Sequence, residues 1–241
     1  MGNLSSLREL YLGQNQLTSL PPQLGNLSSL RELYLGQNQL TSLPSEIGNL
    51  SSLARLDLCD NQLNSLPSEI GNLSSLDQLW LNNNQLTSLP PEIGNLSSLA
   101  SLYLRNNRLT SLPPQLGNLS SLDILNLYEN QLKFIPESIG RLTNLSYITL
   151  GENEELVYPP ADLFTQDVNH IDVFKEYMSK HRDTVSPQGR RKYAWEGIRL
   201  MFIGANDERC TATLGRLPVE LLWNIERFVL ADPYLPTPDP T

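Results

Sequence analysis

Four aromatic residues recur along the chain at multiples of 23 residues: Tyr11, Tyr34, Trp80 and Tyr103. Tyrosine and tryptophan supply a large contact area at a low entropic cost, and both are enriched at the centres of protein–protein interfaces. The chemistry that this spacing predicts is therefore noncovalent recognition of a protein or a peptide. The alternative is drift at positions that no packing constrains, although drift would favour mixed polar residues.

Charged and amide side chains occupy neighbouring positions of the same repeating phrase, where they would set the orientation and the association rate of a partner. Cys59 also lies at one of these positions, and we interpret it as a neutral small residue rather than a reactive thiol. The candidate protein-binding residues are Tyr11, Tyr34, Arg55, Asp57, Asp60, Gln78, Trp80, Asn82, Tyr103, Arg105, Asn126 and Tyr128.

The sequence contains none of the common catalytic motifs. Its only histidines are His170 and His181, and its only cysteines are Cys59 and Cys210. There is no H-E-x-x-H, C-x-x-C or G-x-S-x-G motif and no phosphate-binding loop. We therefore expect no enzyme activity, no cofactor and no metal site. Two cysteines do not form a disulfide framework, which favours a reducing compartment and predicts a cytoplasmic location.

The candidate residues lie in a 23-residue sequence repeat that occurs six times and a seventh time in diverged form. It contains an L-x-L step with the period of a β-strand, so leucines such as Leu33 and Leu35 should point inward and their neighbours outward. One copy cannot bury its own leucines, so successive copies must stack. The T-S-L-P stretch should return the chain in an extended or short 3₁₀ conformation.

An asparagine marks every copy at the point where the chain should leave the strand and turn. Its amide can satisfy backbone groups that a buried turn would otherwise leave unpaired. We therefore interpret this set as structural rather than functional. The set is Asn15, Asn38, Asn61, Asn84, Asn107, Asn130 and Asn153.

A fixed period of about 20–29 residues with L-x-x-L-x-L-x-x-N-x-L at its centre is typical of leucine-rich repeats, which this chain resembles. The resemblance implies an α/β fold: a curved, right-handed horseshoe solenoid with a concave parallel β-sheet, followed by a small α-helical C-terminal region. The candidate binding residues would then line the concave face. We predict leucine-rich repeats over 1–158 with a diverged seventh copy, a capping helix segment over 159–182, and a helical segment with a proline-rich tail over 183–241.

The segment after the repeats resembles the closing segment of intracellular leucine-rich repeat proteins of the Scribble/Erbin kind and of the plant Ras-group-related kind. In those proteins a proline pair precedes a helix with a tyrosine-containing motif, and here Pro159-Pro160 and the stretch from Ile171 to Tyr177 take those places, with a longer spacing. Such a helix would cover the last leucines. We predict it over roughly 167–180, with Val168, Ile171, Phe174 and Met178 on one face.

Farther along, the stretch 217–225 resembles the opening of an F-box, L-P-x-E-L-L-x-x-I. The resemblance implies a substrate receptor of an SCF-type ubiquitin ligase, with a Skp1-like adaptor on the F-box-like helix. A shortened F-box after a repeat array is also similar to repeat proteins of large DNA viruses and giant viruses, which would place the chain in the host cytoplasm. The alternative is a helical cap. The adaptor-binding residues would be Leu217, Pro218, Leu221, Leu222 and Ile225.

The chain has a net charge of −9, and residues 1–160 carry 14 acidic and 7 basic side chains. An acidic solenoid is a poor nucleic-acid binder, so we expect no nucleic-acid partner. No apolar run is long enough to cross a bilayer, so we expect no membrane partner. The turn at Leu4 carries no polar cap, which leaves self-association as a homodimer through the first repeat as a further alternative.

Overall fold

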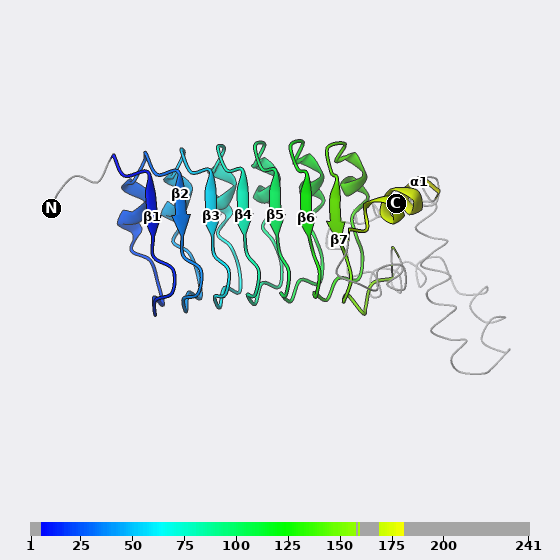
Figure 1. Ribbon diagram of the computed structural model, residues 1–241, viewed down its shortest axis with the longest axis horizontal. Coiled ribbons are helices and arrows are strands. Elements are labelled where there is room, and N and C mark those ends of the chain that lie inside the picture. Colours follow the sequence, from blue (N-terminus) through cyan, green and yellow to red (C-terminus); the bar gives the residue numbers. More distant parts are fainter. Residues whose placement is uncertain (1–5, 158, 160–168, 181–241) are drawn as a thin grey trace, which may run out of the picture. The chain divides into compact units, whose positions relative to one another are not determined.

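The structure is a computed structural model that describes residues 6–157, 159 and 169–180. Seven three-residue strands alternate with six short 3₁₀ turns, and an α-helix follows (Figure 1). This arrangement confirms the solenoid predicted from the repeats. The strands are β1 (Glu9–Tyr11), β2 (Glu32–Tyr34), β3 (Arg55–Asp57), β4 (Gln78–Trp80), β5 (Ser101–Tyr103), β6 (Ile124–Asn126) and β7 (Tyr147–Thr149).

All seven strands form one parallel sheet in chain order, β1 to β7. The register follows the repeat period: Leu10 pairs with Leu33, and Leu33 pairs with Leu56. Because side chains alternate between the two faces of a strand, this register places every middle leucine on the inner face. It also stacks the flanking residues in two rows on the outer face, which we call the concave face, following the usual shape of this fold.

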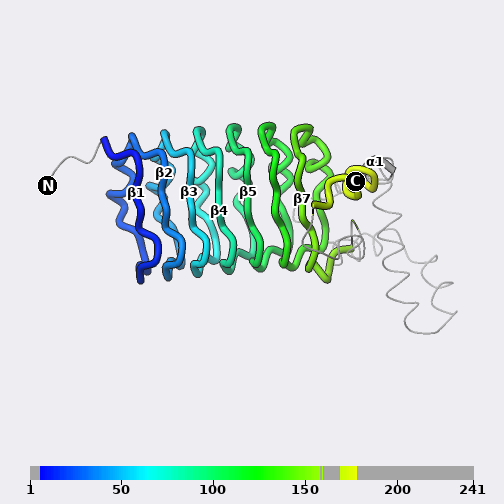
Figure 2. Tube along the Cα trace, viewed as in Figure 1, coloured from blue at the N-terminus to red at the C-terminus, as the bar shows by residue number. Residues whose placement is uncertain are grey.

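Six 3₁₀ turns return the chain on the other side of the leucine core, and neighbouring turns stack along the solenoid (Figure 2). A proline precedes each turn; Pro67, for example, has φ −68° and ψ 149°. The proline ring fixes φ near this value, and its missing N–H leaves no donor unpaired at the start of a turn. The turns are η1 (Pro22–Asn26), η2 (Ser45–Asn49), η3 (Ser68–Asn72), η4 (Pro91–Asn95), η5 (Pro114–Asn118) and η6 (Glu137–Arg141).

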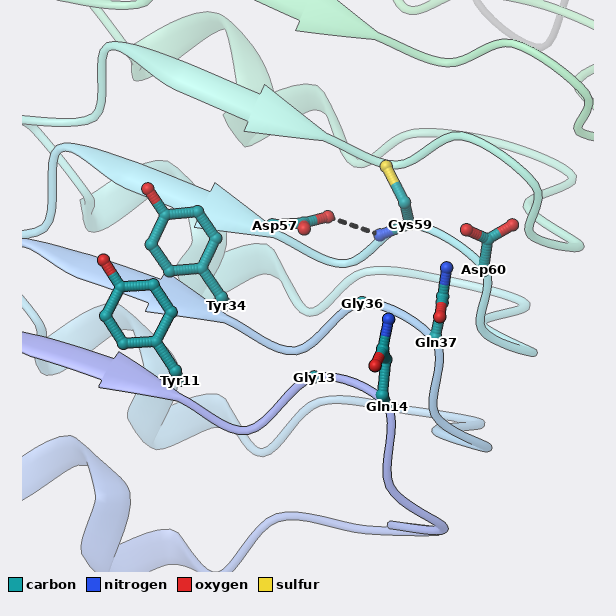
Figure 3. Close-up of a pocket in the computed structure, with 9 residues that line it drawn as sticks. All are labelled: Tyr11, Gly13, Gln14, Tyr34, Gly36, Gln37, Asp57, Cys59 and Asp60. Carbon is teal, nitrogen blue, oxygen red and sulfur yellow. Dashed lines mark hydrogen bonds between the residues drawn. The ribbon is translucent and has the colours of Figure 1, made fainter.

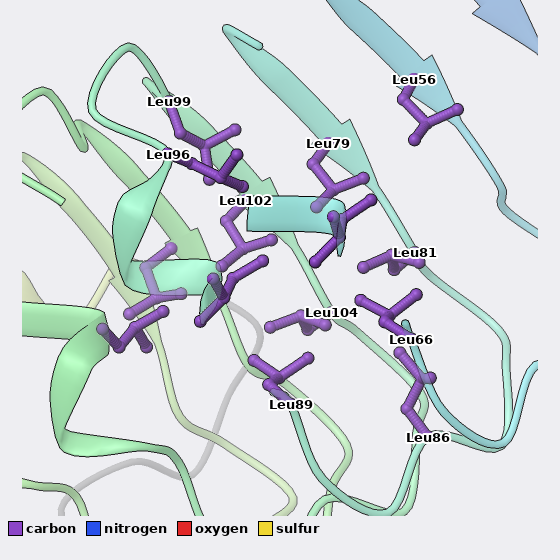
Figure 4. Packing of buried hydrophobic residues seen from close by; sticks show 14 of the residues in the cluster. Leu56, Leu66, Leu79, Leu81, Leu86, Leu89, Leu96, Leu99, Leu102 and Leu104 are labelled. Atoms are coloured by element: carbon purple, nitrogen blue, oxygen red, sulfur yellow. The ribbon is translucent and has the colours of Figure 1, made fainter. Parts of the chain in front are cut away.

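The core between the sheet and the returns consists almost entirely of leucine and isoleucine (Figure 4). In the fourth repeat, Leu79 and Leu81 from the strand side and Leu89 and Ile93 from the return are all buried in the same hydrophobic cluster. Each fully buried side chain of this size contributes about 1.5–3 kcal/mol relative to an exposed one. Stacked repeats therefore stabilise one another, as single repeats cannot.

The asparagine ladder has the predicted structural role. Asn61 accepts a hydrogen bond on Oδ1 from the Leu40 N–H at 3.0 Å and donates from Nδ2 to the carbonyls of Leu35 and Leu58 at 3.1 and 3.2 Å. One side chain thereby joins two successive turns. Asn15, in the first turn, is exposed and bonds only within its own turn, to Leu12 and Gly13.

A row of residues with positive φ lies just before the ladder asparagines, which sequence reasoning did not anticipate. Their φ angles lie between 53° and 59°, in the left-handed region that non-glycine residues enter uncommonly. The turn therefore imposes this conformation on whichever side chain is present. The row consists of Gln14, Gln37, Asp60, Asn83, Asn106, Glu129 and Glu152.

The α-helix α1 (Ile171–Lys180) begins later than the predicted residue 167, because Asn169 and His170 precede it without helical structure. Both residues bond to the open edge of β7: Asn169 Oδ1 accepts from the Ile148 N–H, and His170 N–H donates to the Ile148 carbonyl. Asn169 Oδ1 also accepts the Ile171 N–H at 3.0 Å, which satisfies a donor of the first helical turn and fixes where the helix begins. Ile171 and Phe174 are buried in the core cluster.

The predicted segment 183–241 lies outside the described residues, as do the F-box-like positions Leu217, Pro218, Leu221, Leu222 and Ile225. The predicted capping segment 159–182 is described at Pro159 and over 169–180, so Pro160 and Val168 also fall outside. Within the described ranges, no helix is both long enough and apolar enough to cross a membrane.

Candidate functional site

The concave face carries a continuous row of aromatic rings from β1 to β5. Tyr11 and Tyr34 stack with ring centroids 4.7 Å apart and planes inclined by 6°. The Tyr34 and Trp80 centroids are 6.4 Å apart, although Asp57 occupies the strand between them, and those of Trp80 and Tyr103 are 6.5 Å apart. The rings therefore lean together across an intervening turn and form one strip.

This strip is open to solvent at its first ring, where Tyr11 has 64 % of its surface exposed. The phenol hydroxyls of Tyr11 and Tyr34 donate to the carboxylates of Glu9 and Glu32 at 3.1 and 2.8 Å. The bond to Glu32 is the main cause that raises the pKa of Tyr34, and the bond to Glu9 does the same for Tyr11. Both hydroxyls therefore remain protonated at physiological pH and can donate to these carboxylates.

Two arginines on this face are engaged with neighbouring side chains. Arg55 forms an ion pair with Glu32, with 2.7 Å between Nη1 and Oε1. The Arg105 guanidinium lies over the Tyr128 ring, 4.7 Å from its centroid, and its Nε is 3.9 Å from a Glu129 oxygen. These contacts hold the two positive charges in place, which suits the orienting role predicted for them.

An open pocket of about 360 Å³ lies in the first three turns, between the tyrosines and the row of positive-φ residues (Figure 3). Two of its lining residues, Gly13 and Gly36, have no side chain, and they form its floor. The complete lining is Tyr11, Gly13, Gln14, Tyr34, Gly36, Gln37, Asp57, Cys59 and Asp60.

The pocket ends at Cys59, whose pKa is raised from 9.0 to about 12. Burial of the thiol is the main cause, and the charges of Asp57 and Asp60 add to it. A thiol with this pKa carries almost no thiolate at neutral pH, and the thiolate is the reactive form. This supports the interpretation of Cys59 as a small neutral residue. Within the described ranges no group of three or more His, Cys, Asp or Glu side chains could hold a metal ion.

The structure brings together Tyr11, Tyr34, Asp57 and Asp60 at the pocket and extends the surface through Trp80 and Tyr103. Other candidates bond within the solenoid. Asn82 Oδ1 accepts the Arg105 N–H at 2.9 Å, and Asn126 Oδ1 accepts the Thr149 hydroxyl at 2.8 Å. Gln78 is half-buried on the outer face of β4.

Five pocket residues were absent from the candidate set: Gly13, Gln14, Gly36, Gln37 and Cys59. A signal for the two glycines was present in the sequence, because their position carries a side chain in the next four repeats, namely Cys59, Asn82, Arg105 and Tyr128. Loss of a side chain in two adjacent repeats indicates a hollow between them.

Two family models match the chain, one described as a leucine-rich repeat region over residues 1–88 and one described as a leucine rich repeat over 97–154. The chain is a leucine-rich repeat protein. Leucine-rich repeat proteins are typically non-catalytic, and their concave face is generally a protein-binding surface. A comparison with curated proteins found no match.

Among solved structures, this leucine-rich repeat protein is similar to the ectodomain of the plant membrane receptor kinase GASSHO1/SCHENGEN3 from Arabidopsis thaliana, in complex with CASPARIAN STRIP INTEGRITY FACTOR 2. The identity is 41 % and the TM-score 0.58, over 64 % of this chain and 19 % of that one. A TDR receptor is similar at 38 % identity and TM-score 0.52, over 56 % of this chain and 24 % of that one.

A leucine-rich repeat protein of Leptospira interrogans matches at 29 % identity and TM-score 0.41, over 64 % of this chain and 60 % of that one. The chain thus spans less than two thirds of each of these relatives. Altogether, 372 chains of solved structures match. Because so many proteins share the fold, the fold alone does not determine the partner of this leucine-rich repeat protein, which depends on its own surface side chains.

Proposed function

We propose that this protein is a non-enzymatic interaction module that binds a protein or peptide segment on its concave face. The observation that carries the proposal is the strip of four aromatic rings, Tyr11, Tyr34, Trp80 and Tyr103, in mutual contact on the outer face of the sheet. Large, rigid aromatic side chains in such a row are typical of binding hot spots.

Folding does not require these rings. Asp57 and Asn126 occupy the same strand position in β3 and β6, and their strands pair in the same register as the aromatic ones. The leucines and ladder asparagines hold the repeats together whichever residue stands outside. Aromatic residues at this position therefore have no packing role that a small polar residue could not replace, which supports a role in binding.

The dimensions of the strip favour an extended segment as the partner. From β1 to β5 there are four strand spacings of about 4.8 Å, which gives a strip roughly 19 Å long. An extended chain advances about 3.3 Å per residue, so about six residues would cover the four rings. The Arabidopsis relative, solved in complex with CASPARIAN STRIP INTEGRITY FACTOR 2, is consistent with a repeat array of this class holding a partner.

The proposal is tested with a library of linear peptides displayed on phage and selected against the full chain. The test variant is the triple substitution Tyr34→Ala, Trp80→Ala and Tyr103→Ala. We expect it to bind the selected peptides at least about a hundredfold more weakly, because each hot-spot residue contributes about 2 kcal/mol or more.

The matched control substitutes three threonines, each of which lies seven residues after one of the three aromatic residues. Thr41, Thr87 and Thr110 are exposed on the return stretches, so their triple alanine variant removes the same number of side chains away from the concave face. It should bind as the wild type does. Equal binding by the aromatic variant, with unchanged circular dichroism and unfolding midpoint, would exclude the concave face as the site.

The F-box-like resemblance of 217–225 supports a second candidate, a substrate receptor that presents the concave-bound partner to a Skp1-like adaptor in the cytoplasm. The double variant Leu221→Glu and Ile225→Glu should lose binding to purified adaptor while it retains binding to the selected peptides. Failure of the wild-type chain to bind the adaptor would eliminate this candidate. Self-association, the remaining alternative, predicts a dimer in sedimentation that persists on dilution.

A further inference from the structure

The hollow in the first two turns exists because side chains are missing there, not because the backbone needs glycine. Neither Gly13 nor Gly36 has a positive φ, so the turn itself accepts other residues at this position, and later repeats carry them. A Cβ atom added to Gly36 would lie 3.0 Å from Oδ2 of Asp57. The space over Gly36 is therefore the space that the Asp57 carboxylate faces.

Two carboxylates stand at one end of this hollow, and each accepts a hydrogen bond from a backbone or amide N–H on its Oδ1 atom. Asp57 Oδ1 accepts the N–H of Cys59 at 2.9 Å, and Asp60 Oδ1 accepts from Nδ2 of Asn83 at 2.7 Å. Among the described residues, neither carboxylate belongs to an ion pair. The Cys59 thiol also hydrogen-bonds to Asp57. Because an ionised carboxylate has about four acceptor sites, both groups can accept further hydrogen bonds from a ligand.

Arg55, on the same strand as Asp57, is paired with Glu32 on the tyrosine-hydroxyl side of the strip instead. After burial, the negative charges of Asp57 and Asp60 are a further cause of the raised pKa of the Cys59 thiol, because they oppose a thiolate beside them. The end of the pocket is therefore a site of negative potential next to apolar ring edges.

We propose that this hollow receives a cationic side chain of the bound segment, arginine in preference to lysine. The inference rests on the proposed function, because the side chain belongs to the peptide or protein on the concave face. Its aliphatic stem would lie over Gly13 and Gly36 against Tyr34, and its charged end would reach Asp57 and Asp60. Arginine fits best, because its planar fork can bond two carboxylates at once.

Charge complementarity disfavours apolar and acidic side chains as occupants. An apolar side chain would desolvate two carboxylates without a compensating partner, and an acidic one would add repulsion. A cation with a long apolar stem satisfies both parts of the pocket, because arginine and lysine bury their stems while the charged group stays at a polar rim.

The test compares peptides selected on wild type with those selected on the double variant Asp57→Asn, Asp60→Asn. This variant should fold, because asparagine already occupies the equivalent positions: Asn126 for Asp57, and Asn83 for Asp60. The control is the double variant Glu69→Gln, Glu92→Gln, which removes the same charge from turns η3 and η4 on the other side of the core.

We expect arginine or lysine to be enriched at one position of the peptides selected by the wild type and by the control, but not by the Asp57→Asn, Asp60→Asn variant. For one selected peptide, replacing that basic residue by glutamine should weaken binding to wild type by about tenfold to a hundredfold and leave binding to the double variant nearly unchanged. If the peptide substitution weakens binding to wild type but not to the double variant, the basic side chain of the peptide contacts the two carboxylates.

Two results would overturn the inference. One is selection of peptides that require Tyr34, Trp80 and Tyr103 but carry no common basic residue, and this result leaves the proposed function intact. The other is equal enrichment of basic residues by wild type and by the Asp57→Asn, Asp60→Asn variant. Selection of no peptide that depends on the aromatic strip would instead contradict the proposed function itself.

Discussion

His170 Nδ1 accepts a hydrogen bond from the backbone N–H of Leu150, with 3.2 Å between the two nitrogens. In the preceding repeat the equivalent N–H, that of Leu127, donates to the Thr149 carbonyl of the next strand. After β7 the imidazole takes the place of that missing carbonyl. A side chain thus completes the hydrogen bonding of the last strand edge, and a buried N–H that lost it would remain unsatisfied.

The variant His170→Ala should therefore lower the free energy of unfolding by about 1–3 kcal/mol, the usual cost of a buried unsatisfied donor. Amide hydrogen exchange should accelerate at Leu150 more than at Leu104, which lies deep in the array. The exposed helix residue Asp172 provides the control, since Asp172→Ala leaves the bond intact. Unchanged exchange at Leu150 in the His170 variant would refute a capping role for the imidazole.

Removal of a ladder asparagine should cost more in the middle of the array than at its start. Asn84 accepts from the Leu63 N–H and donates to Leu58 and Leu81, whereas Asn15 is exposed and donates only within its own turn. We expect Asn84→Ala to lower the free energy of unfolding by about 2–4 kcal/mol, and Asn15→Ala by less than about 1 kcal/mol. Urea denaturation measures both, and equal losses would disprove the inter-turn role.

Two glycines should respond differently to alanine. A Cβ atom at Gly71 would collide with the carbonyl oxygen and Cβ of Glu92 in the next turn, whereas one at Gly13 would lie 3.2 Å from the Gly36 carbonyl oxygen. Backbone cannot move aside as a flexible side chain can, so Gly71→Ala should cost about 1–3 kcal/mol, as overpacking does. Gly13→Ala should lower the unfolding midpoint less, and the reverse order would contradict the packing described for the returns.

Alkylation of Cys59 should be slow in the folded protein. Raising the pKa from 9.0 to about 12 leaves about a thousandfold less thiolate at pH 8, because each unit is a factor of ten in the deprotonated form. The measurement is the rate of iodoacetamide modification in a Cys210→Ser background, folded and in urea.

Asp57→Asn should speed the folded reaction, since it removes one of the charges that oppose the thiolate, but burial would keep the rate well below that in urea. A folded rate equal to the denatured rate would show that the thiol is not held in this environment.

Periodicity alone was enough to predict much of this architecture. The L-x-L step identified which leucines, such as Leu33 and Leu35, would be buried, and the 23-residue spacing implied the register of every strand. The ladder asparagines were identified for the same reason. Because each repeat contacts only neighbouring copies of itself, the sequence of one repeat also predicts its contacts with the next.

Only the tertiary structure decided the features in which neighbouring repeats differ. Tyr34 reaches Trp80 across Asp57 because the small side chain between them leaves room for the rings to lean together. Gly36 opens a hollow because it has no side chain, and the Asp57 carboxylate faces that hollow from the next strand. His170 replaces a carbonyl that an eighth strand would have supplied. Each depends on side-chain size and direction across a strand gap, and a repeating pattern of leucines contains no information about either.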